Sequence, residues 1–253
     1  SGKPVVVGRH MIPGAPLSWL WDHPESGFTV PEFGSPPKAF REHAWEVVSL
    51  QPFDRQIEGD GQDLALASRY LDLVLAKSPS AKVLIYQRWP RLTVAGKGVE
   101  FRADAYGPSA KGLATELAGF DRFEDRYLAK YTGGWDLTNE TRDYFARLTE
   151  ALRKKYPATK IEIAPVGDAM LELDRAMRSG KVRGYESVYR LYQDGIHLTD
   201  SGRFLAGSVF FAKIHGSLPP ASSAAYFGKV APELVAPILE AVGKAVQISA
   251  SSR

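Results

Sequence analysis

The sequence predicts an α/β fold in which a parallel β-sheet is covered by helices on both faces. Short, continuously apolar segments alternate along the chain with longer segments whose apolar residues recur at helical spacing. A strand buried on both faces of a parallel sheet has such a continuous apolar run, whereas a half-exposed strand alternates apolar and polar residues. An alternating order of strands and helices is typical of a parallel sheet.

Four segments have the pattern of a buried strand. Each is short and apolar, and most are bounded by proline, glycine or charged residues. The segments are Lys3–Val7, Trp45–Leu50, Lys82–Tyr86 and Lys160–Ala164.

The predicted helices have apolar residues three or four positions apart and recognisable ends. Thr138, and Thr199 or Asp200, are N-cap candidates, while Pro157 and Gly180 end two of the helices. The predicted ranges are 62–76, about 113–131, about 138–155, 168–178, a helix that begins after 199, and 232–246. We expect one domain over residues 1–253, with loop elaborations at about 17–37 and 87–110.

Composition argues against several classes of function. The net charge is +3 and the densest basic cluster is only Arg153-Lys154-Lys155, so no nucleic-acid surface is indicated. The chain has no cysteine, which excludes disulfides, thiolate zinc sites and cysteine nucleophiles. No histidines and carboxylates have metal-ligand spacing, so we expect no metal and no cofactor. No apolar run reaches the roughly 18 residues that span a bilayer, so we expect a soluble protein, with secretion or a periplasmic location left open.

One run carries a chemical signal. Asp194-Gly195-Ile196-His197-Leu198-Thr199 places a carboxylate three residues before a histidine, just ahead of an apolar helix. The carboxylate can reach round the turn and accept a hydrogen bond from the imidazole, and a histidine held in this way can act as a general base for a serine hydroxyl. The run therefore predicts His197 as a base and Asp194 as its partner. The ordinary alternative is a surface turn in which Asp caps a helix.

This run, followed by Gly202, resembles the last conserved block of the SGNH (GDSL-type) hydrolases. The segments 14–19 and Tyr86-Gln87-Arg88-Trp89 look like a subgroup of that family with a Trp-rich early loop. The resemblance implies a flavodoxin-like three-layer α/β/α sandwich with a parallel sheet. It also implies a Ser-His-Asp triad in which His197 and Asp194 are two of the three members.

The resemblance also implies an oxyanion hole. The backbone N–H of Gly14 occupies the place of one family donor. The family's further donor is an Asn side chain, which is absent here, so the amide of Gln87 or the indole N–H of Trp89 would donate instead.

The nucleophilic serine of the family has no counterpart in this sequence. The family has five parallel strands and places its serine after the first, whereas four strands are predicted here and the first of them leads to Gly14. We therefore expect the family's first strand and helix, a segment of roughly 30 to 40 residues that carries the serine, to precede Ser1. Ser18 is the best candidate inside the chain, and Ser201 and Ser208 are expected to support the helix that follows His197.

The expected substrate is a small molecule or glycan that carries an ester, for example an acetyl group on a carbohydrate, or a small lipid ester. Trp19 and Trp21 would form a platform for a sugar ring or acyl chain, and Arg88 would bind an anionic group. Two alternatives remain open: a non-catalytic glycan-binding module on the same fold, and a glycan-active hydrolase or transferase that uses carboxylates. Asp22, Asp104 and Asp136 lie in loops that suit the latter.

Overall fold

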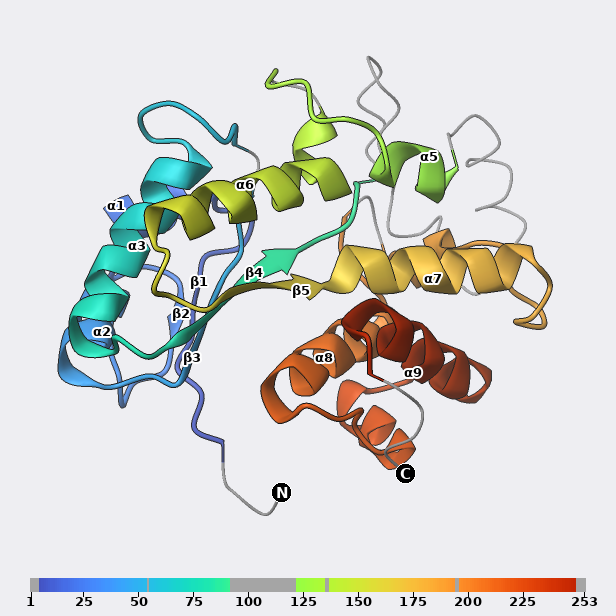
Figure 1. Cartoon of the computed structure of the whole chain (residues 1–253). Coiled ribbons are helices and arrows are strands. Elements are labelled where there is room, and N and C mark those ends of the chain that lie inside the picture. The colour runs from blue at the N-terminus through green and yellow to red at the C-terminus, as the bar shows by residue number, and fades with distance from the viewer. Residues whose placement is uncertain (1–4, 54, 92–121, 135–136, 194–195, 249–253) are drawn as a thin grey trace. The chain divides into compact units, whose positions relative to one another are not determined.

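The computed structural model describes residues 5–53, 55–91, 122–134, 137–193 and 196–248. The chain divides into two compact units. The first comprises Ser1–Gln87, Lys130–Asn139 and Asp143–Ile163, and the second comprises Arg88–Ala129, Glu140–Arg142 and Ala164–Arg253. Figure 1 shows the elements of both units.

A three-stranded parallel sheet organises the first unit. Its strands are β3 (Val47–Leu50), β4 (Lys82–Gln87) and β5 (Ile161–Pro165), in the order β3-β4-β5. Val47 lies opposite Lys82, and Leu50 lies opposite Ile85. The backbone N–H of Val83 donates to the carbonyl of Lys160 at 2.9 Å, which joins β4 to the start of β5. The mixed α/β class with a parallel sheet is therefore as predicted.

Two helices connect the three strands. These are α3 (Asp63–Lys77), between β3 and β4, and α6 (Arg142–Lys155), which leads into β5. Parallel connections are right-handed, so strands added successively in one direction place their connecting helices on the same face. Figure 1 shows α3 and α6 on one face of the strands. The carboxylate of Asp63 in the first turn and the side chain of Lys77 in the last turn of α3 both have the sign that the helix dipole favours.

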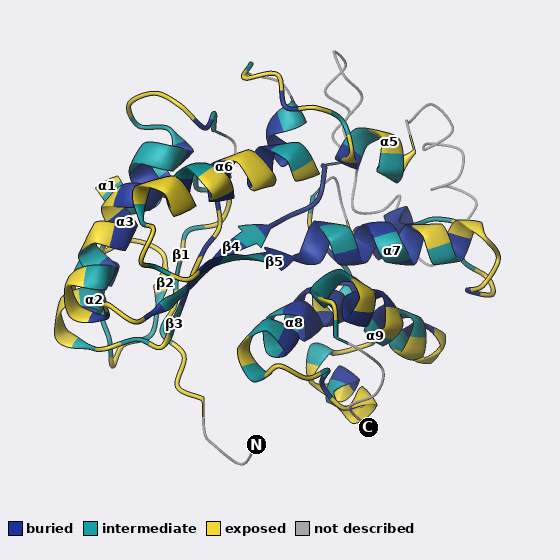
Figure 2. Cartoon of the chain, in the orientation of Figure 1, coloured by how far each residue is buried: buried dark blue, intermediate teal, exposed yellow. Residues whose placement is uncertain are grey.

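The core of the first unit lies between these helices and the sheet. Val83, Leu84 and Ile85 are fully buried in β4, so both faces of this strand are covered. Figure 2 shows the buried residues concentrated along the strands and on the inward sides of the helices. One core cluster gathers residues from α3, α6 and the strands, among them Leu66, Leu71, Val83, Leu148 and Ile161.

The N-terminal part of the first unit is less regular. It contains α1 (Leu17–Asp22), α2 (Pro36–Glu42) and a two-residue antiparallel pair, β1 (His10–Met11) with β2 (Phe28–Thr29). The strand predicted at Lys3–Val7 is wrong for the part that the structure describes. Val5, Val6 and Val7 form no regular element and are 54%, 69% and 65% exposed. A β-branched run becomes a strand only where a neighbouring strand satisfies its backbone, and no described strand pairs with this one.

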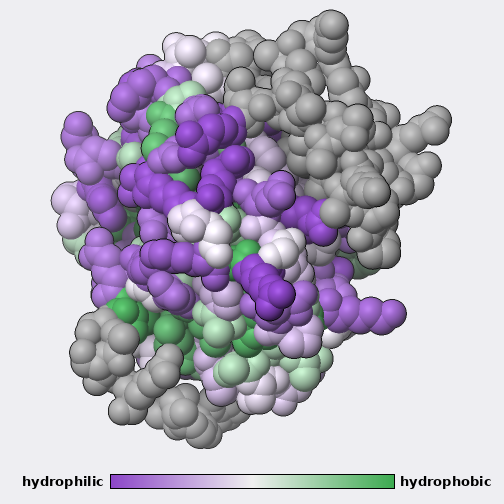
Figure 3. Space-filling model, turned by 90° about the vertical axis from the view of Figure 1, so that its right-hand side faces the viewer, coloured by the Kyte–Doolittle hydropathy of each residue, from purple (hydrophilic) through white to green (hydrophobic). Residues whose placement is uncertain are grey.

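Helices dominate the second unit. They are α5 (Phe123–Tyr127), α7 (Val166–Arg178), α8 (Asp200–His215) and α9 (Pro232–Val246), with the short 3₁₀ turns η3 (Val188–Leu191) and η4 (Ala221–Phe227). A further 3₁₀ turn, η2 (Leu137–Glu140), belongs to the first unit except for its last residue. Helix α7 contacts both α8 and α9 and is buried along most of its length. Among the described residues on the face in Figure 3, hydrophilic side chains predominate and apolar ones form smaller groups.

The helix ends agree closely with the sequence prediction. The hydroxyl of Thr199 accepts the N–H of Gly202 at 3.4 Å, so Thr199 is the N-cap of α8. Gly180 has φ +76° and follows the end of α7. The predicted helix at about 138–155 begins later, because residues 137–140 form the 3₁₀ turn η2 before α6. Of the helix predicted at about 113–131, residues 113–121 lie outside the described residues, and α5 occupies 123–127.

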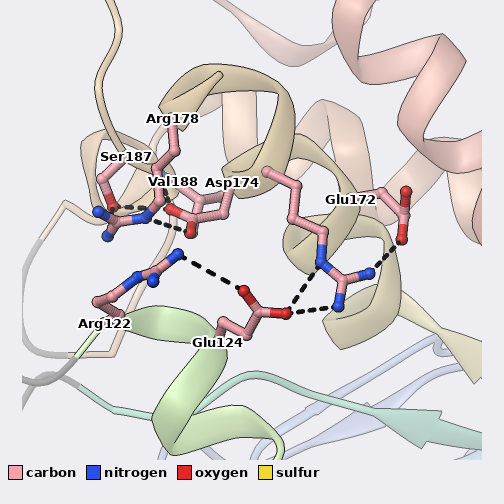
Figure 4. A network of polar contacts seen from close by, with 8 residues as sticks. Arg122, Glu124, Glu172, Asp174, Arg178, Ser187 and Val188 are labelled. Atoms are coloured by element: carbon pink, nitrogen blue, oxygen red, sulfur yellow. Dashed lines mark hydrogen bonds and ion pairs between the residues drawn. The ribbon is translucent and has the colours of Figure 1, made fainter. Parts of the chain in front are cut away.

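A buried carboxylate ties the end of α7 to the segment that follows it. Asp174 accepts hydrogen bonds from the Ser187 hydroxyl (2.9 Å), the Val188 backbone N–H (2.9 Å) and Arg178 Nε (2.7 Å). Figure 4 shows these contacts beside a second group that contains Arg122 and Glu124. The Glu124 carboxylate pairs with both Arg122 and Arg175. Asp174 is fully buried, whereas the Glu172 carboxylate, paired with Arg175 on the same helix, is 29% exposed.

We expect Asp174→Ala to lower the free energy of unfolding by about 3–5 kcal/mol, because it leaves a guanidinium and a buried N–H without their acceptor. Glu172→Ala is the matched control, since it also removes an acid paired with an arginine on α7. An exposed pair contributes only about 0–1 kcal/mol. Urea denaturation of both variants measures the difference. Equal losses would show that burial of the Asp174 network contributes nothing extra.

Candidate functional site

The chain leaves β4 through a buried loop at residues 88–91. Arg88 and Trp89 are 3% and 9% exposed, although arginine is a residue type that is rarely buried without a partner. The carboxylate of Glu140, itself 1% exposed, supplies that partner. Its Oε1 lies 2.7 Å from Arg88 Nη2 and 2.6 Å from Arg91 Nε, and its Oε2 accepts the backbone N–H of Arg91 at 2.7 Å. One carboxylate therefore holds both ends of the loop.

Two further hydrogen bonds join this loop to the segment around His197. The hydroxyl of Tyr192 donates to the carbonyl of Pro90 at 2.8 Å. The indole Nε1–H of Trp89 donates to the carbonyl of Ile196, also at 2.8 Å. Residues more than one hundred positions apart in the sequence are thus joined directly.

His197 is exposed, and the backbone around it is fixed on both sides. The carbonyl of Ile196, which shares a peptide plane with the N–H of His197, accepts from Trp89. The carbonyl of His197 accepts the backbone N–H of Gln193 at 2.8 Å. Tyr192 and Leu198 form an antiparallel bridge, and the N–H of Thr199 donates to the carbonyl of Leu191 at 2.8 Å. Hydrogen bonds therefore hold both peptide planes that flank the Cα of His197, while the residue itself is exposed.

A second polar group lies where β5 leads into α7. Asp168, in the first turn of α7, accepts the Tyr127 hydroxyl at 3.2 Å and Arg142 Nε at 3.0 Å. The backbone is tightly packed here, because a Cβ added at Gly167 would lie 2.6 Å from the carbonyl oxygen of Arg88. The glycine therefore allows α7 to start directly against the loop that follows β4.

Burial controls the ionisation of the tyrosines in this region. Burial raises the pKa of the Tyr127 hydroxyl well above its usual value, and the negative charge of Asp168 raises it further. Burial also raises the pKa of Tyr192 well above its usual value. Both hydroxyls therefore stay protonated, and can donate hydrogen bonds, at alkaline pH values at which an ordinary tyrosine ionises.

The structure brings only some of the predicted site residues together. Trp89 contacts the chain at His197, but its indole N–H, predicted as an oxyanion donor, is hydrogen-bonded to Ile196. Arg88, predicted to bind an anionic substrate, is instead buried against Glu140. Asp194, the predicted partner of His197, lies outside the described residues.

The other predicted site residues belong to the first unit. Gly14 is exposed in a turn with φ +71°, and Gln87 is 1% exposed at the end of β4. Trp21 is half-buried, with its ring edge-on to Tyr70 at 5.0 Å between centroids. Trp19 is 52% exposed and stacks on His23 with ring centroids 3.9 Å apart.

Sequence reasoning missed Glu140, Tyr192 and Asp168. None lies in a recognisable motif, and each acts on a segment far away in the sequence. A charged residue directly after a buried strand, such as Arg88, was the available signal, because it requires a buried acid somewhere else in the chain.

Within the described residues, no cluster of three or more histidine, aspartate or glutamate side chains has an arrangement that could bind a metal ion. The helices of the described part contain none with the length and apolar character required to span a bilayer.

The tyrosine pKa shifts predict a loss of stability at alkaline pH. Folding raises the pKa of such a hydroxyl above its value of about 10 in the unfolded chain. At pH values below about 10 its contribution to the stability of the native state is complete, and this contribution is lost as the pH rises above about 10. Phenylalanine cannot ionise, so the free energy of unfolding of Tyr127→Phe lacks this contribution. Between pH 9 and pH 11 we expect it to fall by about 1.4 kcal/mol less than that of the unmodified chain. Urea denaturation at the two pH values measures this, and the same loss in both proteins would contradict it.

Comparison with known proteins supports the fold. No protein-family model matches the chain, and no curated protein matches it. The chain is similar to the crystal structure of a DUF4886 family protein from Bacteroides uniformis ATCC 8492, with a TM-score of 0.51 and 14% sequence identity over 95% of this chain and 83% of that chain. At this identity the likeness shows the fold alone, a mixed α/β fold with a three-stranded parallel sheet flanked by helices.

Proposed function

We propose that the protein is a serine esterase or acyl hydrolase of SGNH type, which acts on esters of carbohydrates or on small lipid esters. The observation that carries the proposal is the exposed His197, whose two flanking peptide planes are held by Trp89 and Gln193. A general base needs this combination of access to solvent and fixed direction. The α/β fold with a parallel sheet, which suits ligand binding beyond the carboxyl ends of its strands, also supports it.

In the proposed reaction the imidazole of His197 takes the proton of a serine hydroxyl as the serine oxygen attacks the ester carbonyl. The imidazolium then gives the proton to the leaving alcohol, and a water molecule repeats the sequence to release the acid. Asp194 orients the ring and stabilises its charged form, a role that rests on the family resemblance. The indole N–H of Trp89 donates to Ile196, so it is not proposed as an oxyanion donor.

The serines beside His197 do not qualify as nucleophiles. Ser201 is 6% exposed, and its Oγ accepts the backbone N–H of Ala231 at 3.1 Å. Ser208 is 1% exposed within α8. Ser18, half-buried on α1, stays the candidate nucleophile that the sequence offers.

Hydrolysis of p-nitrophenyl acetate by the natural protein tests the proposal. We expect His197→Ala to lower kcat by about a thousandfold or more, as loss of a triad member does. His215→Ala is the matched control, because this histidine lies at the far end of α8 and its ring packs at a tilt against Phe211. Hydrolysis that is unaffected by His197→Ala would contradict the proposal, and turnover lost in Ser18→Ala would identify Ser18 as the nucleophile.

A second function, glycan binding without catalysis, is favoured by one observation. Trp19 is 52% exposed and lies parallel to His23, with an interplanar angle of 20°. His23 Nδ1 also lies 3.0 Å from the Trp19 carbonyl, so the stacked pair is held in place. A flat, exposed and preorganised aromatic ring suits the apolar face of a sugar.

For this second function we expect Trp19→Ala to weaken binding of a soluble polysaccharide by tenfold or more, since burying an aromatic ring contributes about 1.5–3 kcal/mol. Affinity electrophoresis in gels that contain xylan or another glycan gives the measurement. Tyr226→Ala is the control, because Tyr226 is an aromatic residue with 89% exposure outside this pair. Equal retardation of the Trp19→Ala variant and the unmodified chain would exclude Trp19 as the platform.

A further inference from the structure

We propose that Trp89 is a positioning residue for His197, and that Glu140 anchors the loop from which Trp89 acts. The inference rests on the proposed role of His197 as a base, and it gives Trp89 a role different from that of an oxyanion donor. Trp89 does not touch the reacting atoms in this scheme. It fixes the backbone that carries the imidazole.

The first step of the argument is the geometry of the peptide plane. The carbonyl oxygen of Ile196 and the N–H of His197 belong to one planar unit, so the bond from Trp89 at 2.8 Å fixes the orientation of both groups. The bond from Gln193 N–H to the His197 carbonyl fixes the next plane. The direction of the bond from Cα to Cβ of His197 follows from these two planes.

The second step is the rigidity of the donor. Trp89 is 9% exposed and lies between Arg88 and Arg91, both of which are held by Glu140. The next residue, Pro90, is held at its carbonyl by the Tyr192 hydroxyl. An indole on a mobile loop would follow the movement of the Ile196 carbonyl and could not restrain it. Here the loop is anchored on both sides, so the indole restrains the turn.

The third step is the electrostatic cost of the anchor. Two guanidinium groups share one carboxylate that is 1% exposed, with three hydrogen bonds to its two oxygens. A buried ion pair is a weak source of net stability, because desolvation offsets the attraction, yet removing one partner is strongly unfavourable. The arrangement therefore favours one loop conformation more than it stabilises the whole chain, as a positioning device requires.

Amide hydrogen exchange tests the inference independently of any enzymatic activity. The N–H of Gln193 donates to His197, so its exchange rate reports opening of the turn. We expect Trp89→Phe to raise this rate three- to tenfold, which corresponds to the loss of one ordinary hydrogen bond. Trp45→Phe is the matched control, because Trp45 Nε1–H also donates to a backbone carbonyl, that of Ala39 at 3.1 Å. An unchanged Gln193 rate in Trp89→Phe would overturn the inference.

Kinetics add a readout that a purely structural role would not move. We expect Trp89→Phe to lower kcat for p-nitrophenyl acetate about tenfold with KM changed less than twofold, after normalisation to folded protein. An equal fall in Trp45→Phe, or a change in KM alone, would overturn the positioning role.

If Trp89→Phe does not fold, slow exchange of the Trp89 indole proton in the unmodified chain supports the inference and fast exchange overturns it. If His197→Ala leaves hydrolysis intact, the proposed function fails, while the exchange rate of Gln193 still tests the positioning role.

Discussion

The buried carboxylate of Glu140 is the constraint on which the candidate site depends. It pairs with the guanidinium groups of the two arginines that follow β4, Arg88 and Arg91. It also accepts the backbone N–H of Arg91. Arg88 and Glu140 are both almost fully buried, so a change of loop conformation that separates this ion pair is strongly unfavourable. Through Trp89 and Tyr192 the same constraint extends to the turn that bears His197. A single acid thus links the exit of a core strand to an exposed imidazole.

The parallel sheet explains why such polar groups gather in these segments. Its central strand β4 is fully buried at Val83, Leu84 and Ile85, so no polar side chain is tolerated along that stretch. Polar and charged residues therefore begin where the strand ends, with Gln87 and Arg88, and again in the first turn of α7 with Asp168. Each then requires a partner from another segment, and these partnerships fix the loops. The chemistry of the site thus follows from the apolar character of the strand.

The regular elements were largely predictable from the sequence. Periodicity and capping located α3, α7, α9 and strands β3 to β5 within about two residues, because these signals are local. The N-cap of α8 was narrowed to Thr199 or Asp200 for the same reason, and the structure shows that it is Thr199. The strand predicted at Lys3–Val7 failed, since strand formation depends on a neighbour that composition does not reveal. The site was predicted only in part: the motif pointed to His197, whereas Glu140 and Tyr192 act across long sequence separations that no local pattern encodes.

The exposed valines at 5–7 have a consequence for the behaviour of the protein in solution. Three consecutive β-branched residues on an unpaired backbone are a template for intermolecular strand pairing, the first step of amyloid-like association. The sequence limits this tendency on either side. Lys3 and Pro4 precede the run and Arg9 follows it, so stacked copies would bring like charges together and lose a ladder hydrogen bond at the proline. The part of this protection that comes from charge weakens at high ionic strength, because salt screens the repulsion that keeps the copies apart.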